Sequence, residues 1–144
     1  MSLESTDIHP TAIVDPAAHL GAGVSIGPYC VVGPDVRLGE GVILKSHVVV
    51  RGPSNIGNGV QIYQFATVGE DTPALAFKGE DSVLEVGEGT IIREGVTIHR
   101  GMAKRGIQKT IIGSICLLMA YVHVGHDCIV GNNVIMANNA SLSG

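Results

Sequence analysis

The residues of this chain best suited to chemistry are two histidines and an aspartate in the stretch VHVGHDC. His123 and His126 stand three residues apart on either side of Val124, and Asp127 follows directly. Neutral imidazole is well suited to act as a general base near pH 7. Because no serine or cysteine pairs obviously with either histidine, direct attack by a substrate hydroxyl fits better than a covalent intermediate. The alternative is that both histidines are ordinary polar surface residues.

A second candidate feature is a cluster of basic residues that follows His99. Four of the nine basic residues of the chain fall within ten positions: Arg100, Lys104, Arg105 and Lys109. Such a cluster is either a solvated surface loop or a binding site for an anionic ligand or an acidic protein partner. The sequence pattern leaves both possibilities open.

The elements that must position these residues have a period of six. Twenty hexads carry an apolar anchor, in three runs: Ile8, Val14, Leu20, Ile26, Val32, Leu38, Leu44, Val50, Ile56, Ile62 and Val68; Val86, Ile92 and Ile98; Ile112, Leu118, Val124, Val130, Met136 and Leu142. This period fits neither an α-helix nor simple strand alternation, and it is typical of a hexapeptide-repeat parallel β-helix. Three hexads make one triangular coil. We therefore expect one all-β domain over residues 1–144, a prism of between six and seven coils, left-handed as in the fold class that it resembles.

Two other positions of the hexad are restricted. The residue four after the anchor is nearly always small, and all three cysteines, Cys30, Cys116 and Cys128, fall there. We expect them to be small buried hydrophobes rather than metal ligands or a disulfide, since no C-x-x-C pair is present. Glycine follows the anchor directly in ten hexads, which suits a positive φ or a close backbone approach.

The count of six fails twice, in a first insertion over residues 69–85 and a second insertion over residues 99–111. In a solenoid, insertions map to loops that often carry the binding surface. Pro73 and the charged residues mark the first insertion as an excursion from the prism, and the second contains the basic cluster.

Composition limits the remaining possibilities. Aromatic residues make up only 3% of the chain and tryptophan is absent, as a narrow prism interior requires. A net charge of −4 argues against nucleic acid as the main partner. The longest apolar run covers only positions 117–122, far too few for a membrane span. With no signal peptide before the first repeat, we expect a cytoplasmic protein without a metal or cofactor.

Several segments carry a family resemblance. The runs IREGVTIHRG, SHVVV, IYQFATVGE, HVGHD and ANNASLSG resemble the UDP-N-acetylglucosamine O-acyltransferases that begin lipid A synthesis. The resemblance spans essentially the whole chain. It implies a left-handed β-helix assembled as a homotrimer, with active sites in the clefts between subunits. The implied reaction moves a 3-hydroxyacyl chain from acyl carrier protein to the 3-hydroxyl of UDP-N-acetylglucosamine.

The resemblance also implies roles for particular residues. His126 matches the general base, Asp127 the carboxylate that orients it, and His99 and His123 the histidines that line the sugar and acyl site. Gly144 lies three hexads after His126, so the repeat count predicts that it stacks on His126 one coil further along. By resemblance alone, the Gly144 amide matches the donor to the thioester oxyanion.

The chain departs from the family in the first insertion and in length. Where the family usually has an Asp-Leu-Lys run that contacts the substrate, this chain has Ala74, Leu75 and Ala76, so only Leu75 is carried over as a substrate-binding residue. Met102 stands where threonine is usual. The chain ends at Gly144, inside a hexad, without the family's later coils and C-terminal helical domain. We therefore expect a fragment or a shortened relative with impaired activity.

Two alternatives to the acyltransferase remain open. A truncated or degenerate trimeric scaffold without catalysis would explain Ala74, Ala76 and the missing end. A γ-class carbonic anhydrase shares the prism and the trimer, but it needs three zinc histidines, two of them at a wider spacing than His123 and His126.

Overall fold

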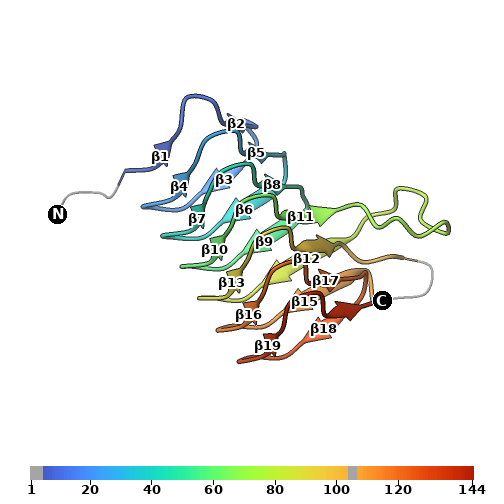
Figure 1. Cartoon of the computed structure of the whole chain (residues 1–144). Helices are drawn as coiled ribbons and strands as arrows, with labels where there is room; N and C mark the ends of the chain where they lie inside the picture. Colours follow the sequence, from blue (N-terminus) through green and yellow to red (C-terminus); the bar gives the residue numbers. More distant parts are fainter. Residues whose placement is uncertain (1–4, 104–106) are drawn as a thin grey trace.

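The structure is a computed structural model, and it describes residues 5–103 and 107–144. These residues form 20 short strands in three parallel sheets, which make the three faces of a left-handed β-helix (Figure 1). The predicted fold class is confirmed. No helix in the described part of the chain is long and apolar enough to cross a membrane.

Each sheet takes every third strand. Sheet I contains β1 (Asp7–Ile8), β4 (Ser25–Ile26), β7 (Ile43–Leu44), β10 (Gln61–Ile62), β13 (Ile91–Ile92), β16 (Leu117–Leu118) and β19 (Ile135–Met136). Sheet II contains β2 (Ile13–Val14), β5 (Val31–Val32), β8 (Val49–Val50), β11 (Thr67–Glu70), β14 (Thr97–His99), β17 (His123–Val124) and β20 (Ser141–Leu142). Sheet III contains β3 (His19–Leu20), β6 (Val36–Leu38), β9 (Ser54–Ile56), β12 (Val83–Val86), β15 (Lys109–Ile112) and β18 (Ile129–Val130).

The anchors of successive coils pair with one another and fill the interior. Ile26 pairs with Leu44, three hexads further along the chain, and the interior anchors Ile26, Leu44, Ile62, Ile92 and Leu118 are at most 1% exposed. Such burial is worth about 1.5–3 kcal/mol for each aliphatic side chain. The period of six thus encodes the core directly. Cys30 and Cys116 are buried as predicted, whereas Cys128 is only partly buried, and all three are free thiols.

Most of the glycines that follow the anchors serve close approach between coils, and Gly33 and Gly131 are the exceptions. A Cβ added to Gly87 would lie 2.5 Å from the Gly113 carbonyl carbon, in the next coil. Positive φ occurs mostly further round the corner, at the third position after the anchor, where non-glycine residues such as Asp127 (φ 60°) also stand. Close approach, rather than a positive φ, is therefore the usual reason for a glycine directly after the anchor.

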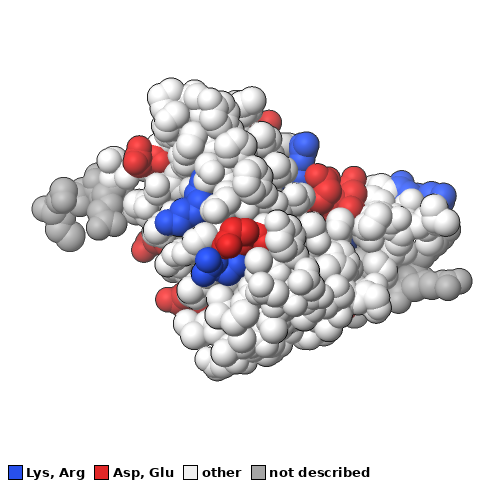
Figure 2. Space-filling view, viewed as in Figure 1, with Lys and Arg blue, Asp and Glu red and all other residues white. Residues whose placement is uncertain are grey.

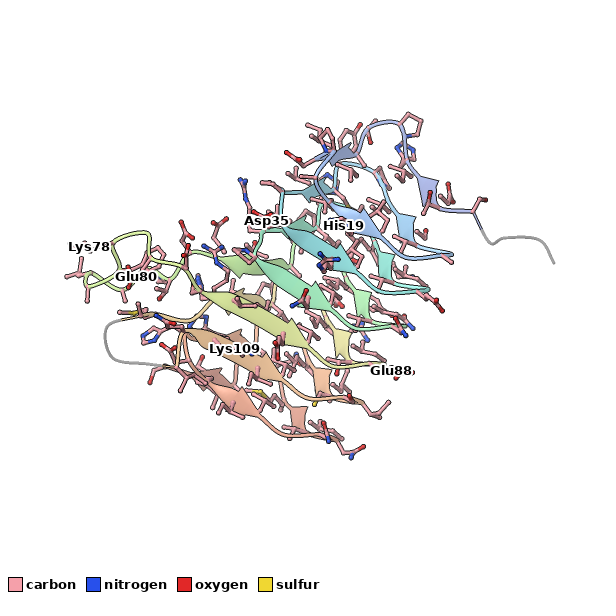
Figure 3. The ribbon with its side chains drawn as sticks, turned by 180° about the vertical axis from the view of Figure 1, so that it is seen from behind. His19, Asp35, Lys78, Glu80, Glu88 and Lys109 are labelled. Carbon is pink, nitrogen blue, oxygen red and sulfur yellow. The ribbon has the colours of Figure 1, made fainter. Side chains whose placement is uncertain are left out.

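Both insertions leave the prism at the corner between sheets II and III. The first joins β11 to β12 and the second joins β14 to β15 in the next coil. Each lengthens the coil that contains it, so that Ile62 pairs with Ile92 across the first insertion and Ile92 pairs with Leu118 across the second. The anchors therefore regain their columns after each insertion. The first insertion projects from the side of the prism, near the C-terminal end of the chain (Figure 1), and carries Lys78 and Glu80 (Figure 3).

Candidate active site

His126 and Asp127 form a hydrogen-bonded pair at the corner that follows β17. The His126 Nδ1 atom lies 2.7 Å from Asp127 Oδ2. A carboxylate only accepts hydrogen bonds, so Nδ1 carries the proton and the neutral ring keeps its lone pair on Nε2. The Asp127 side chain is only 11% exposed and that of His126 27%. This arrangement gives His126 the orientation and the tautomer that a general base requires.

Residues of the second insertion hold Asp127 in place. The Met102 N–H lies 3.1 Å from both carboxylate oxygens, and the Asp127 N–H donates to Thr110 Oγ1 at 3.0 Å. Gly101 permits this approach, because an added Cβ would lie 2.8 Å from Asp127 Oδ1. The second insertion therefore contributes the Met102 amide and the Thr110 hydroxyl to the site.

Gly144 lies against the ring of His126, where the repeat count places it. The pairing of Val124 with Leu142 puts residues three hexads apart in one column, and a Cβ added to Gly144 would lie 2.8 Å from His126 Nε2. A side chain at this position would therefore press on the nitrogen that is free to accept a proton.

His99 and His123 lie side by side in adjacent coils. Their ring centroids are 5.3 Å apart in an edge-on arrangement. His99 Nδ1 lies 2.8 Å from the Asp71 carbonyl oxygen, and His123 Nδ1 shares a hydrogen bond of 2.8 Å with Thr97 Oγ1. Burial, and secondly the charge of a protonated His99, lower the pKa of His123 below its ordinary value of 6.5. His123 is thus kept neutral over a wider pH range than a free histidine.

These groups line a cleft of about 180 Å³ between the histidines and the first insertion. Its walls are formed by Thr72, Pro73, Ala74, His99, His123, Gly125, His126 and Ser143. The predicted residues His99, His123 and His126 therefore meet in one cavity. Leu75 does not join them, since it is 96% exposed on the first insertion. A larger groove of about 720 Å³ follows sheet III. Its lining is mostly aliphatic side chains and glycine, with His19, Arg37, Asn55 and Glu85 as its polar residues, and Glu85 is paired with Lys109.

The expected basic cluster does not form a free cationic surface in the part that the structure describes. Arg100 is only 9% exposed and pairs with Asp71, while Lys109 pairs with Glu85 at 2.9 Å. Lys104 and Arg105 lie outside the described residues. On the face seen in Figure 2, acidic and basic side chains occur near one another rather than in a patch of one sign.

Sequence reasoning missed the groups that orient the histidines. Thr97, Thr110, the Met102 amide and the Asp71 carbonyl each contact a histidine or Asp127. Thr97 could have been found, because matching the anchors Ile98 and Val124 places it beside His123. The two backbone groups carry no signal in the residue types.

The family model for the bacterial transferase hexapeptide, six repeats, matches residues 6–52 and 109–144. Acyl-[acyl-carrier-protein]–UDP-N-acetylglucosamine O-acyltransferases are similar to the chain over 137 residues. That of Saccharophagus degradans is 56% identical, covering 94% of this chain and 52% of the relative, and that of Pseudomonas aeruginosa is 60% identical, covering 95% and 53%.

Solved structures agree with these matches. LpxA from Acinetobacter baumannii is 49% identical with a TM-score of 0.93, covering 95% of this chain and 53% of that one. The UDP-N-acetylglucosamine acyltransferase of Francisella novicida is 40% identical with a TM-score of 0.92, covering 95% and 50%. The chain spans about half the length of the relatives it matches. It belongs to the bacterial transferase hexapeptide family, and its relatives there are UDP-N-acetylglucosamine O-acyltransferases.

Proposed function

We propose that this chain carries the general base of an acyltransferase that moves a 3-hydroxyacyl group from acyl carrier protein to the 3-hydroxyl of UDP-N-acetylglucosamine. The observation that carries the proposal is the His126–Asp127 pair, with Nε2 of His126 free beside Gly144 in a cleft. The names of the relatives supply the two substrates.

The chemistry follows from the position of the free lone pair. His126 Nε2 takes the proton of the sugar 3-hydroxyl as its oxygen attacks the thioester carbonyl carbon. The carbonyl electrons move onto oxygen, and the Gly144 N–H donates to this oxyanion, an interaction worth about 3 kcal/mol of barrier. When the intermediate collapses, the C–S bond breaks and the thiolate takes the proton back from His126. Asp127 stabilises the imidazolium that forms in between.

His99 and His123 are proposed to bind the sugar and acyl parts of the substrates. Both line the same cleft as His126. Leu75 is exposed, so a role in binding requires a contact that a single chain does not make.

A homotrimer is the proposed assembly. The cleft of about 180 Å³ is smaller than the roughly 300–1,000 Å³ of typical ligand pockets, and a sugar nucleotide together with an acyl thioester is a large ligand. A second copy that supplies another wall would enlarge the cleft. The three free thiols fit the reducing cytoplasm as the proposed location.

Single-turnover kinetics test the proposal. The purified chain is mixed with 3-hydroxyacyl carrier protein and UDP-N-acetylglucosamine, and the O-acylated product is measured by mass spectrometry while light scattering gives the oligomeric mass. We expect transfer above background, and a loss of about 10²-fold or more in His126→Ala, the usual range for a general base. His19→Ala is the matched control, an exposed histidine on β3 in sheet III (Figure 3). Equal rates in the parent and His126→Ala, or no transfer by the folded parent, would overturn the proposal.

A further inference from the structure

Arg100 is a buried cation that the proposed reaction does not use. It is 9% exposed, and a buried guanidinium requires partners to offset its lost hydration. Nη1 donates to the Gly69 carbonyl at 2.6 Å, and Nη2 forms the ion pair with Asp71. The buried Nε has no hydrogen-bond partner among the described residues. The role of Arg100 therefore lies in these contacts rather than in making the surface soluble.

The partners of Arg100 are three consecutive residues at the start of the first insertion. Besides Gly69 and Asp71, the Glu70 carbonyl accepts from the Arg100 backbone N–H at 3.1 Å. The pairing of β11 with β14 is irregular here, with a shift between Val68 and Glu70. Bulges of this kind redirect the chain and re-aim the groups that follow. Arg100 therefore fixes the direction in which the first insertion leaves the prism.

Asp71, whose side chain pairs with Arg100, also contacts His99 through its backbone carbonyl. The Asp71 side chain pairs with Arg100, while the Asp71 carbonyl lies 2.8 Å from His99 Nδ1. A carbonyl oxygen can only accept, so Nδ1 must carry a proton. In neutral His99 the remaining nitrogen, Nε2, is then the acceptor on a ring that lines the cleft.

From this geometry we infer that Arg100 and Asp71 together are positioning residues that fix the tautomer of His99. They hold the Asp71 carbonyl on Nδ1 and thereby make His99 a hydrogen-bond acceptor toward a hydroxyl or N–H donor of the ligand. The tautomer itself does not depend on the proposed function. Its consequence, tighter binding of the hydroxyl-bearing acceptor, rests on that function.

The exposed carboxylate of Asp71 offers a clean perturbation. Its side chain is 56% exposed, so Asp71→Asn should fold, and it leaves the backbone carbonyl present while weakening its anchor. Arg100→Lys is the second variant, because lysine keeps the charge but loses the fork that contacts both Gly69 and Asp71. Glu94→Gln is the matched control, since it removes the carboxylate partner of Arg93 at 2.6 Å, on residues that do not line the cleft.

The experiment reads the tautomer directly. Long-range ¹H–¹⁵N correlation spectra of the histidine rings, assigned with His99→Gln, are recorded at a pH where His99 is neutral. We expect the Nδ1–H form in the parent and in Glu94→Gln. In Asp71→Asn and Arg100→Lys the ratio should shift about fivefold or more toward Nε2–H, the change expected from a weakened hydrogen bond. If Arg100→Lys does not fold, Asp71→Asn decides.

Two results would overturn the inference: an Nε2–H ring in the parent, or an unchanged Nδ1–H ring in Asp71→Asn. A purely structural role for Arg100 predicts the second result. Acyl transfer supplies an independent readout, in which Asp71→Asn should raise KM for the sugar nucleotide with little change in kcat. A parent without acyl transfer but with the expected tautomer shift would refute the proposed function and leave this inference standing.

Discussion

Replacing Asp127 by asparagine separates the effect of the carboxylate from that of the backbone. Asp127 has a φ of 60°, a region in which asparagine is as acceptable as aspartate. The carboxylate contacts the Met102 N–H through both oxygens, at 3.1 Å each, and His126 Nδ1 at 2.7 Å. An amide has one oxygen only. If the oxygen faces His126, the amide nitrogen opposes the Met102 donor; if the nitrogen faces His126, the imidazole must accept at Nδ1 and loses its lone pair on Nε2.

The size of the effect follows from these contacts. Both orientations remove the charge that stabilises an imidazolium, and Asp→Asn in the Ser-His-Asp triad lowers kcat about 10⁴-fold. General-base catalysis as a whole contributes about 10²–10⁴-fold. We therefore expect a loss of about 10²–10⁴ in the single-turnover rate, or roughly 3–5 kcal/mol in barrier. The free energy of unfolding should fall by about 1.5–3 kcal/mol, the range for hydrogen bonds to charged groups.

The assay compares acyl transfer and urea unfolding in the parent and in two variants. Asp35→Asn is the control, because Asp35 occupies the equivalent corner after β5 with a φ of 57° and is exposed (Figure 3). It should change neither rate nor stability. A rate for Asp127→Asn within about threefold of the parent would refute the role of the carboxylate, and an equal loss in both variants would assign the effect to the corner.

Three further predictions concern stability, titration and binding. Gly87→Ala should destabilise the chain by about 1–3 kcal/mol in urea unfolding, because its Cβ would overlap the next coil. Gly131→Ala, whose Cβ would meet nothing within 4 Å, should change the free energy of unfolding by no more than about 0.5 kcal/mol. The lowered pKa of His123 means that the unfolded chain binds more protons at this residue between the folded pKa and the ordinary value of 6.5. The contribution of His123 to the free energy of unfolding is therefore present above pH 6.5 and is lost as the pH falls through the folded pKa. This pH-dependent contribution should vanish in His123→Gln. His99→Gln should raise the pKa of His123 in an NMR titration. Ala74→Asp should change KM for the sugar nucleotide more than kcat, because Ala74 lines the cleft opposite the histidines.

The fold was predictable because the apolar anchor of each hexad identifies the residue that faces the core. An anchor of an interior coil, such as Leu118, is buried, and the exposed anchors Ile8 and Leu142 belong to the first and last coils, so no long-range information is needed. The stacking of Gly144 on His126 follows from the same count, since no insertion separates them. Arg100 could also have been placed: it stands two after the anchor Ile98, on the inward side by strand alternation, and the basic run around it hid that signal.

The partners of the histidines were not predictable for a different physical reason. Met102 and Asp71 act through backbone groups. Every residue has these groups, so the residue type gives no indication of their role. Their positions depend on the path of each insertion, and that path is fixed by contacts such as Arg100 with Gly69 and Asp71 rather than by the repeat.

The site therefore has two parts that can change separately: the repeat columns and the first insertion. His126 and Gly144 belong to one column of the repeat and Asp127 to the column beside it, and the anchors of β14, β17 and β20 hold these columns in register. The opposite wall of the cleft belongs to the first insertion, which returns to the prism at β12 without disturbing the anchors. Because the columns on either side of an insertion are fixed independently of its interior, we expect a substitution such as Ala74→Asp to alter what the cleft binds and to leave the proposed proton chemistry of His126 in place.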